Sequence, residues 1–284
     1  MVSQRKHTFK LLSYSLLLYV LIEVFLFVII FLSYNAEKKN IENSTAYITE
    51  ILSEEIEKTL QKGVQMLIGL QDLLEVSKDA YTPFSPQIHN ILMKHIESNE
   101  FLRYILVINQ KGEIIHWTED AKPPSVKDRD YVLAHVDPDS SGKIFLGMPN
   151  VSRAHNNVMF FPVSISSYYK DSGLMFVFAA IFSSDYFNKL LKKYQFSDNL
   201  NITLVKNSGE VITSLDDNLS GAKIDLNPFV FHKPSMSYSK HMETSLAPES
   251  NIYSYADMNK FPLKVIANYP SYKVWKNILG ELII

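Results

Sequence analysis

Residues 104–117 read YILVINQKGEIIHW and have the composition of a β-hairpin. Two short runs rich in β-branched and aromatic residues flank a turn-like segment at 109–112. The pattern recurs 97 residues later as ITLVKNSGEVIT, with Gly209 aligned to Gly112 and Ile212 to Ile115. A match of strand, turn and strand over this length indicates two related modules in tandem.

Further apolar runs predict the elements around the two hairpins. Ser85-Pro86 should start a helix that runs to about Glu97, and Ser184 should cap one that ends near Tyr194. We expect strands at 143–147, 158–166, 174–182, 236–242, 252–256 and 261–268, with a turn at 169–173. The predicted fold class is α+β, with a small antiparallel sheet in each module.

An apolar run of 22 residues, from Leu11 to Leu32, precedes these modules. As a helix it would be about 33 Å long, enough to cross a hydrocarbon core of about 30 Å. A cleaved signal peptide is disfavoured because its apolar core would be only about 7–15 residues long. The run therefore predicts an uncleaved transmembrane helix at 11–33, anchored in the lipid bilayer.

The charges around this run predict its orientation. Arg5, Lys6 and Lys10 precede the run, and no comparable basic excess follows it. The positive-inside rule then places residues 1–10 in the cytoplasm and the main domain outside. Glu23 is the acid inside the run, and it is either a functional intramembrane group or a tolerated passenger.

A long helix is expected to continue the membrane helix. No proline interrupts residues 36–81, and apolar residues recur at steps of 3 and 4 from Ile41 to Leu74. This apolar stripe either packs on the domain core or forms a parallel dimer seam, and it could do both at opposite ends.

The C-terminal residues suggest a second membrane segment. Residues 271–276 are aromatic and basic, as at a membrane interface, and 278–284 begin an apolar run. We expect a truncated second transmembrane helix at 273–284, in a fragment or a truncated gene, rather than a helix docked on the domain. The extracytoplasmic part would span 34–272, with a distal module at about 82–196 and a proximal module at about 197–270.

Composition and missing motifs exclude several classes of function. The sequence has no cysteine, so it can form neither a disulfide nor a cysteine-based metal site. A net charge of −2 offers no case for nucleic-acid binding. His116, His135 and His155 lack metal-ligand spacing, and no catalytic or phosphate-binding motif occurs. We expect that the chain is not an enzyme and that it binds neither a metal nor a cofactor.

The order of several short motifs resembles the double Cache sensor domains of bacterial receptors. The motifs are DRDY at 128–131, IFLGMP at 144–149, SR at 152–153, DSG at 171–173 and AAIFSSDYF at 179–187. With the long helix and the two hairpins, the resemblance covers about residues 41–275. Such domains consist of PAS-like modules and occur on histidine kinases, diguanylate cyclases and chemoreceptors.

The resemblance implies a sensory function. The chain would be a homodimer in the bacterial inner (cell) membrane that binds a small ligand in its distal module and signals through its flanking helices. No kinase or cyclase output domain lies within these 284 residues. The alternative is a degenerate or ligand-independent membrane-anchored scaffold that lacks its output domain.

The same motifs supply candidate ligand contacts. Arg129 and Arg153 could clamp a carboxylate, because the guanidinium fork matches its geometry, although Arg129 could instead pair with Asp128 or Asp130. Tyr131 would offer a hydroxyl, and His135 and Asp185 complete the candidate set.

Two departures from the family pattern bear on the ligand. Residues 161–164 read FPVS where a Ser-Arg pair often occurs, and Ala180 stands where amino-acid-binding members place an acid. The resemblance therefore favours a carboxylate or another small anion over an amino acid. Trp117 is expected to end a strand rather than line the pocket.

Overall fold

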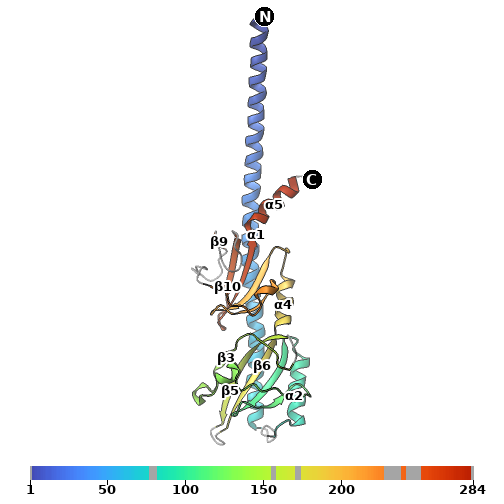
Figure 1. Cartoon of the computed structure of the whole chain (residues 1–284), viewed down its shortest axis with the longest axis vertical. Coiled ribbons are helices and arrows are strands. Elements are labelled where there is room, and N and C mark those ends of the chain that lie inside the picture. The colour runs from blue at the N-terminus through green and yellow to red at the C-terminus, as the bar shows by residue number, and fades with distance from the viewer. Residues whose placement is uncertain are drawn as a thin grey trace.

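A single long helix organises the computed structural model, which describes residues 2–76, 82–154, 158–169, 174–226, 238–240 and 251–282. Helix α1 (Val2–Val76) is 75 residues long and runs from the N-terminus past both modules, with the distal module at its far end (Figure 1). Its part from Ser13 contains a window apolar enough to cross a membrane. The predicted continuous helix is therefore confirmed, and the membrane boundaries stay predictions.

The distal module is an antiparallel sheet with short helices at its edges. Within the described ranges its strand order is β2-β1-β6-β5-β3, with β4 also paired to β5. The strands are β1 (Leu102–Asn109), β2 (Ile114–Trp117), β3 (Ile144–Leu146), β4 (Asn150–Val151), β5 (Met159–Tyr169) and β6 (Leu174–Ser183). The helices are α2 (Pro86–Glu97), α3 (Asp130–Leu133) and the 3-10 turn η2 (Pro138–Ser140).

The proximal module repeats this plan in the order β8-β7-β11-β10-β9. Its strands are β7 (Asn201–Lys206), β8 (Val211–Ser214), β9 (Tyr238–Lys240), β10 (Asn251–Asp257) and β11 (Leu263–Pro270), with a 3-10 turn η3 (Asp217–Leu219). Helix α4 (Ser184–Lys193) joins the modules, and α5 (Ser271–Leu282) follows the last strand. The two antiparallel sheets confirm the predicted fold class.

The two hairpins are related in their backbone geometry as well as in sequence. Gly112 and Gly209 have φ angles of 74° and 96°, a region that L side chains rarely adopt. A register shift falls between Val107 and Ile108 in one hairpin and between Leu204 and Val205 in the other, at equivalent positions. The tandem repeat read from the sequence is therefore a structural repeat.

The apolar stripe of α1 is the common wall of the core. It packs against β10 and β11 of the proximal sheet and then against β5 and β6 of the distal sheet. Except for the half-buried Ile51, the apolar residues of the stripe from Ile41 to Leu74 are at most 8% exposed. Glu54 and Lys58, on the opposite face of the helix, are exposed to solvent. The alternative prediction, that this stripe forms a dimer seam, is therefore wrong, because the two sheets already cover the stripe. The homodimer itself stays a prediction.

Close approach between α1 and the distal sheet depends on Gly63. A Cβ atom built at this glycine would lie 2.4 Å from Cζ of Phe182. Phe182 stacks on Phe101 and Phe161, with ring centroids 5.6 and 5.3 Å away, and contacts Phe187. The glycine thus lets the helix backbone rest on an aromatic cluster.

Helix α5, at the C-terminal end of the chain, lies against α1 beside the proximal module (Figure 1). Tyr34 of α1 stacks on Trp275 of α5 with ring centroids 4.3 Å apart. Val274 and Ile278 are buried in the core. The first turns of α5 are therefore docked, as in the alternative considered for this segment, and a second membrane helix stays a prediction.

Some local expectations need correction. Ser183, not Ser184, caps α4, since its Oγ accepts the N–H of Tyr186 at 3.4 Å. Ser85 precedes α2 without a side-chain capping bond. Of the predicted strand at 236–242 only β9 is described. Residues 170–173, which hold the DSG motif, and His155 lie outside the described residues.

Substitution of the two helical glycines of α1 tests this packing. Gly63→Ala should destabilise the protein by about 1–3 kcal/mol because the added methyl overpacks the aromatic cluster. Gly69→Ala should stabilise it by about 0.5–1 kcal/mol, since Gly69 is exposed and a methyl group added there would meet no atom within 4 Å. Thermal unfolding followed by the fluorescence of Trp117 and Trp275 measures both. Equal effects of the two substitutions would contradict the proposed close approach.

Candidate functional site

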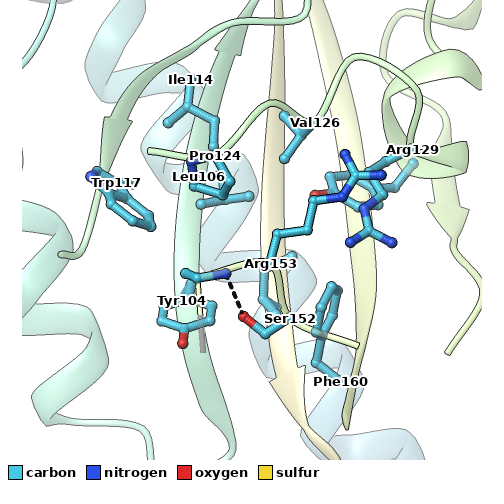
Figure 2. Close-up of a pocket in the computed structure, with 13 residues that line it drawn as sticks. Tyr104, Leu106, Ile114, Trp117, Pro124, Val126, Arg129, Ser152, Arg153 and Phe160 are labelled. Atoms are coloured by element: carbon cyan, nitrogen blue, oxygen red, sulfur yellow. Dashed lines mark hydrogen bonds between the residues drawn. The ribbon is translucent and has the colours of Figure 1, made fainter. Parts of the chain in front are cut away.

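A small cavity lies on the outer face of the distal sheet, the face turned away from α1 (Figure 2). Its volume is about 30 Å³. Since one ordered water needs about 10–15 Å³ on this scale, the cavity has room for about two waters. It is a small, mostly apolar chamber rather than a wide cleft.

The floor of the cavity follows from the alternation of side chains along the strands. In β1, Tyr104 and Leu106 face the cavity, whereas Ile105 and Val107 face α1. Ile181 of β6 and Phe160 of β5 complete the floor. Trp117, at the end of β2, forms one wall, so the expectation that it only ends the strand is wrong.

The same alternation corrects the inference drawn from Ala180. Ala180 belongs to the α1 side of β6, while Val177, Ala179 and Ile181 belong to the outer cluster. A ligand in the cavity would therefore meet Ile181 and not residue 180. The conclusion that this strand offers no acid to a ligand still holds, because all three outward-facing residues are apolar.

The roof comes from the segment before α3 and from the loop around β4. Pro124 and Val126 cover one side, and Ser152 and Ala154 cover another (Figure 2). Ser152 Oγ accepts the backbone N–H of Ala154 at 3.2 Å, which fixes this loop locally. Arg129, Arg153 and Tyr131 add polar groups to the lining, besides the hydroxyl of Tyr104 and the indole N–H of Trp117.

Arg129 immediately precedes α3 and is only 8% exposed. Its Nη2 donates to the carbonyl of Val151 at 3.1 Å, and its Cζ lies 6.0 Å from the ring centroid of Phe160. Its Nε is buried and has no hydrogen-bond partner among the described residues. In the described part of the chain, the alternative in which Arg129 pairs with Asp128 or Asp130 is not found, and its Nε is left without a partner.

Arg153 takes the place of Arg129 as the partner of Asp128. Its Nη1 and Nη2 donate to the two carboxylate oxygens at 2.7 and 2.6 Å, and Nη1 also donates to the carbonyl of Ser125 at 2.7 Å. Hydrogen bonding to this guanidinium holds the pKa of Asp128 well below its usual range. Both arginines line the cavity (Figure 2), but Arg153 is already satisfied.

Tyr131 lies in the first turn of α3 and is 2% exposed. Burial raises the pKa of its phenol, so the hydroxyl stays neutral and can donate a hydrogen bond. The structure thus brings together Arg129, Tyr131 and Arg153, as the sequence predicted.

The other two candidates lie outside the cavity. His135 follows α3, is 1% exposed, and contacts Ser164 of β5 through Nε2 at 2.9 Å. Asp185 is exposed in the first turn of α4. Tyr104, Leu106 and Phe160 also line the cavity and were not predicted from the sequence, although the alternation along the strands places Tyr104 and Leu106 on one face.

A second hollow of about 320 Å³ is lined by Trp117 and by residues within or next to α2 and β2. His89 and His116 line it together with Asp120, which lies 3.7 Å from His89. Among the described residues, no group of three or more potential metal ligands is found here or elsewhere.

Comparison with known proteins identifies the fold. Neither a protein-family profile nor a curated protein sequence matches the chain. The extracellular domain of rpHK1S-Z16, described as a histidine kinase, superimposes with a TM-score of 0.69 at 20% identity, over 83% of this chain and 97% of that one. The periplasmic sensory domain of the Campylobacter jejuni chemoreceptor Tlp1 superimposes with a TM-score of 0.66 at 14% identity. The match covers 84% of this chain and 98% of that one.

A third similar structure is the ligand-binding domain of the Pseudomonas aeruginosa amino acid chemoreceptor PctC in complex with GABA. It gives a TM-score of 0.59 at 15% identity, over 81% of this chain and 99% of that one. The chain therefore has the fold of extracytoplasmic sensory domains of histidine kinases and chemoreceptors. The resemblance to Cache sensor domains is confirmed at the level of the fold.

The buried His135 predicts a pH dependence of stability. Burial lowers its pKa to about 4, below the value of about 6.5 for an exposed histidine. Between these values the unfolded chain binds the proton more readily, so the free energy of unfolding should fall by about 2–3 kcal/mol as the pH falls from about 6.5 to 4.

His135→Gln should flatten this part of the stability profile, measured by denaturant unfolding at several pH values. His95→Gln, on half-exposed α2, is the control and should leave the slope unchanged. An unchanged slope in His135→Gln would show that other groups cause the acid sensitivity.

Proposed function

We propose that this chain is a membrane-anchored sensory domain that binds a small carboxylate in the cavity of its distal module. The observation that carries the proposal is the Nε of Arg129, a buried donor without a partner among the described residues, at the wall of an apolar chamber. A buried polar group of this kind is destabilising unless something binds it. A ligand carboxylate would supply the missing acceptor.

The cavity also limits the class of ligand. Its volume of about 30 Å³ suits a molecule with few heavy atoms, such as acetate or propionate, unless the roof opens. Tyr131 could donate a second hydrogen bond, and the apolar floor would cover a short alkyl group. Of the two acids beside Arg129 in the sequence, Asp128 is exposed and paired with Arg153, and Asp130 accepts the N–H groups of Met148 and Tyr131.

An amino acid fits this site poorly. The solved structures of similar fold include domains bound to GABA, L-valine and L-arginine. Among the described residues that line the cavity here, none is acidic, so a ligand ammonium would be buried without a partner. We infer that this chain responds to an anion without a free amine.

The proposed signal runs through α1. The roof residues Arg129 and Tyr131 flank the start of α3, and binding would favour the conformation in which roof and floor are drawn together. The distal sheet rests directly on α1, which continues towards the membrane (Figure 1). A small displacement of the sheet would therefore reach the membrane helix.

In this proposal the main domain is extracytoplasmic, the membrane is the bacterial inner membrane, and the chain is not an enzyme.

A panel of ligands tests the proposal. Acetate and propionate should raise the unfolding temperature of the full chain in detergent, while glycine and GABA should not. Arg129→Met should weaken binding about ten- to 100-fold, because a hydrogen bond to a charged group contributes about 1.5–3 kcal/mol.

Lys127→Met is the matched control, since Lys127 is an exposed cation two residues away in the same loop. Its affinity should equal that of the unmodified protein. If no carboxylate in a broad panel binds, the alternative of a ligand-independent scaffold is supported instead.

A further inference from the structure

Lys206 is a buried lysine of the proximal module that reaches into the distal module. It is the last residue of β7, and the hairpin turn holds its backbone through bonds from Lys206 N–H to Glu210 and from Gly209 N–H to Lys206, at 2.9 and 2.8 Å. Its side chain extends away from this turn, and the residue as a whole is 9% exposed. A lysine is rarely buried to this extent without specific partners.

The ammonium of Lys206 finds these partners in one short loop of the distal module, Leu146-Gly147-Met148. It donates to the carbonyl oxygens of Leu146 at 3.0 Å and Gly147 at 3.4 Å, and it lies 3.5 Å from Sδ of Met148. An ammonium has three donors, so this loop accounts for all of them. The contact joins the two modules directly.

The same loop is held from the opposite side by Asp130. Its Oδ2 accepts the N–H of Met148 at 2.5 Å, and its Oδ1 accepts the N–H of Tyr131 at 2.8 Å. Gly147 is packed so closely that an added Cβ would lie 2.4 Å from Pro162 and 3.2 Å from the Asp130 carboxylate. Asp130 therefore connects this loop to Tyr131, in the roof of the cavity.

The positive charge of Lys206 and the negative charge of Asp130 attract each other across the loop. Burial lowers the pKa of Lys206, and the carboxylates of Glu210 and Asp130 oppose this change. The cation reaches the loop from the proximal module, and the Asp130 carboxylate reaches it from the start of α3. Displacing the loop would weaken the hydrogen bonds of both.

The repeat shows that this contact is not inherent in the hairpin. Asn109 occupies the position of Lys206 in the distal hairpin, with the same backbone bonds to Glu113 and from Gly112. Its side chain stays within its own turn, where Oδ1 accepts the N–H groups of Lys111 and Glu113. The equivalent position forms a local turn in one module and an intermodule bridge in the other.

We propose that Lys206 couples the ligand cavity to the proximal module by tying the loop 146–148, and through Asp130 the cavity roof, to the β7–β8 hairpin. Lys206 is thus a positioning residue that makes the hairpin respond when the roof moves. Its role in signalling rests on the proposed function, whereas the mechanical coupling can be measured without any ligand.

Hydrogen–deuterium exchange on the full chain in detergent tests the coupling. Asp130→Asn disturbs the loop from the cavity side and should speed amide exchange at residues 202–214 by about threefold or more when Lys206 is present. In a Lys206→Met background, Asp130→Asn should add no further change at 202–214. Lys223→Met removes an exposed cation of the same module, which pairs with Glu210, and should leave the transmission intact.

A purely structural role would give a different result. Lys206→Met would then speed exchange on its own, and Asp130→Asn would still add its full effect at 202–214, which would overturn the proposal. If Lys206→Met does not fold, Lys206→Gln, whose amide is too short to reach the loop, replaces it with the same expected outcomes.

A propionate arm separates this proposal from the proposed function. Propionate should slow exchange at 129–133 in both the unmodified and the Lys206→Met protein, but at 202–214 only in the unmodified protein. If propionate has no effect anywhere, the ligand proposal fails, and the Asp130→Asn comparison still decides the coupling.

Discussion

The packing of one face of α1 against the inner faces of two successive sheets is the constraint on which the rest of the structure depends. The buried stripe from Ile41 to Leu74 is a single wall shared by both modules, so their cores form one continuous cluster. Because apolar burial is the main favourable contribution to folding, neither sheet can leave this helix without exposing its inner face. The helix is therefore both the main support of the domain and its connection to the apolar N-terminal segment.

In this arrangement the small cavity lies on the outer face of the distal sheet, where we propose that the ligand binds. Strand alternation divides β1, β5 and β6 between α1 on one side and a thin roof on the other. The roof is made of short segments around Arg129 and Ser152, and Val126 and Tyr131 bury their side chains against the outer face of the sheet.

The duplicated hairpin shows how one backbone solution can serve two purposes. Both copies share the left-handed glycine, the register shift and the turn hydrogen bonds. They differ in the side chain at the end of the first strand, asparagine in one and lysine in the other. A short side chain closes its own turn, whereas a long cationic one reaches the neighbouring module, so a change of one residue type alters the connection between the modules.

The sequence by itself determined the local features: the long helix, the two hairpins and the antiparallel sheets. Apolar periodicity and turn glycines act over a few residues and can be read directly. Only the tertiary structure decided which face each residue occupies and which distant group it meets. It moved Ala180 to the α1 side, left His135 and Asp185 outside the cavity, paired Arg153 with Asp128, and placed Lys206 against the distal loop. These outcomes depend on strand register and on contacts between residues far apart in the chain, where a shift of one position exchanges the two faces of a sheet.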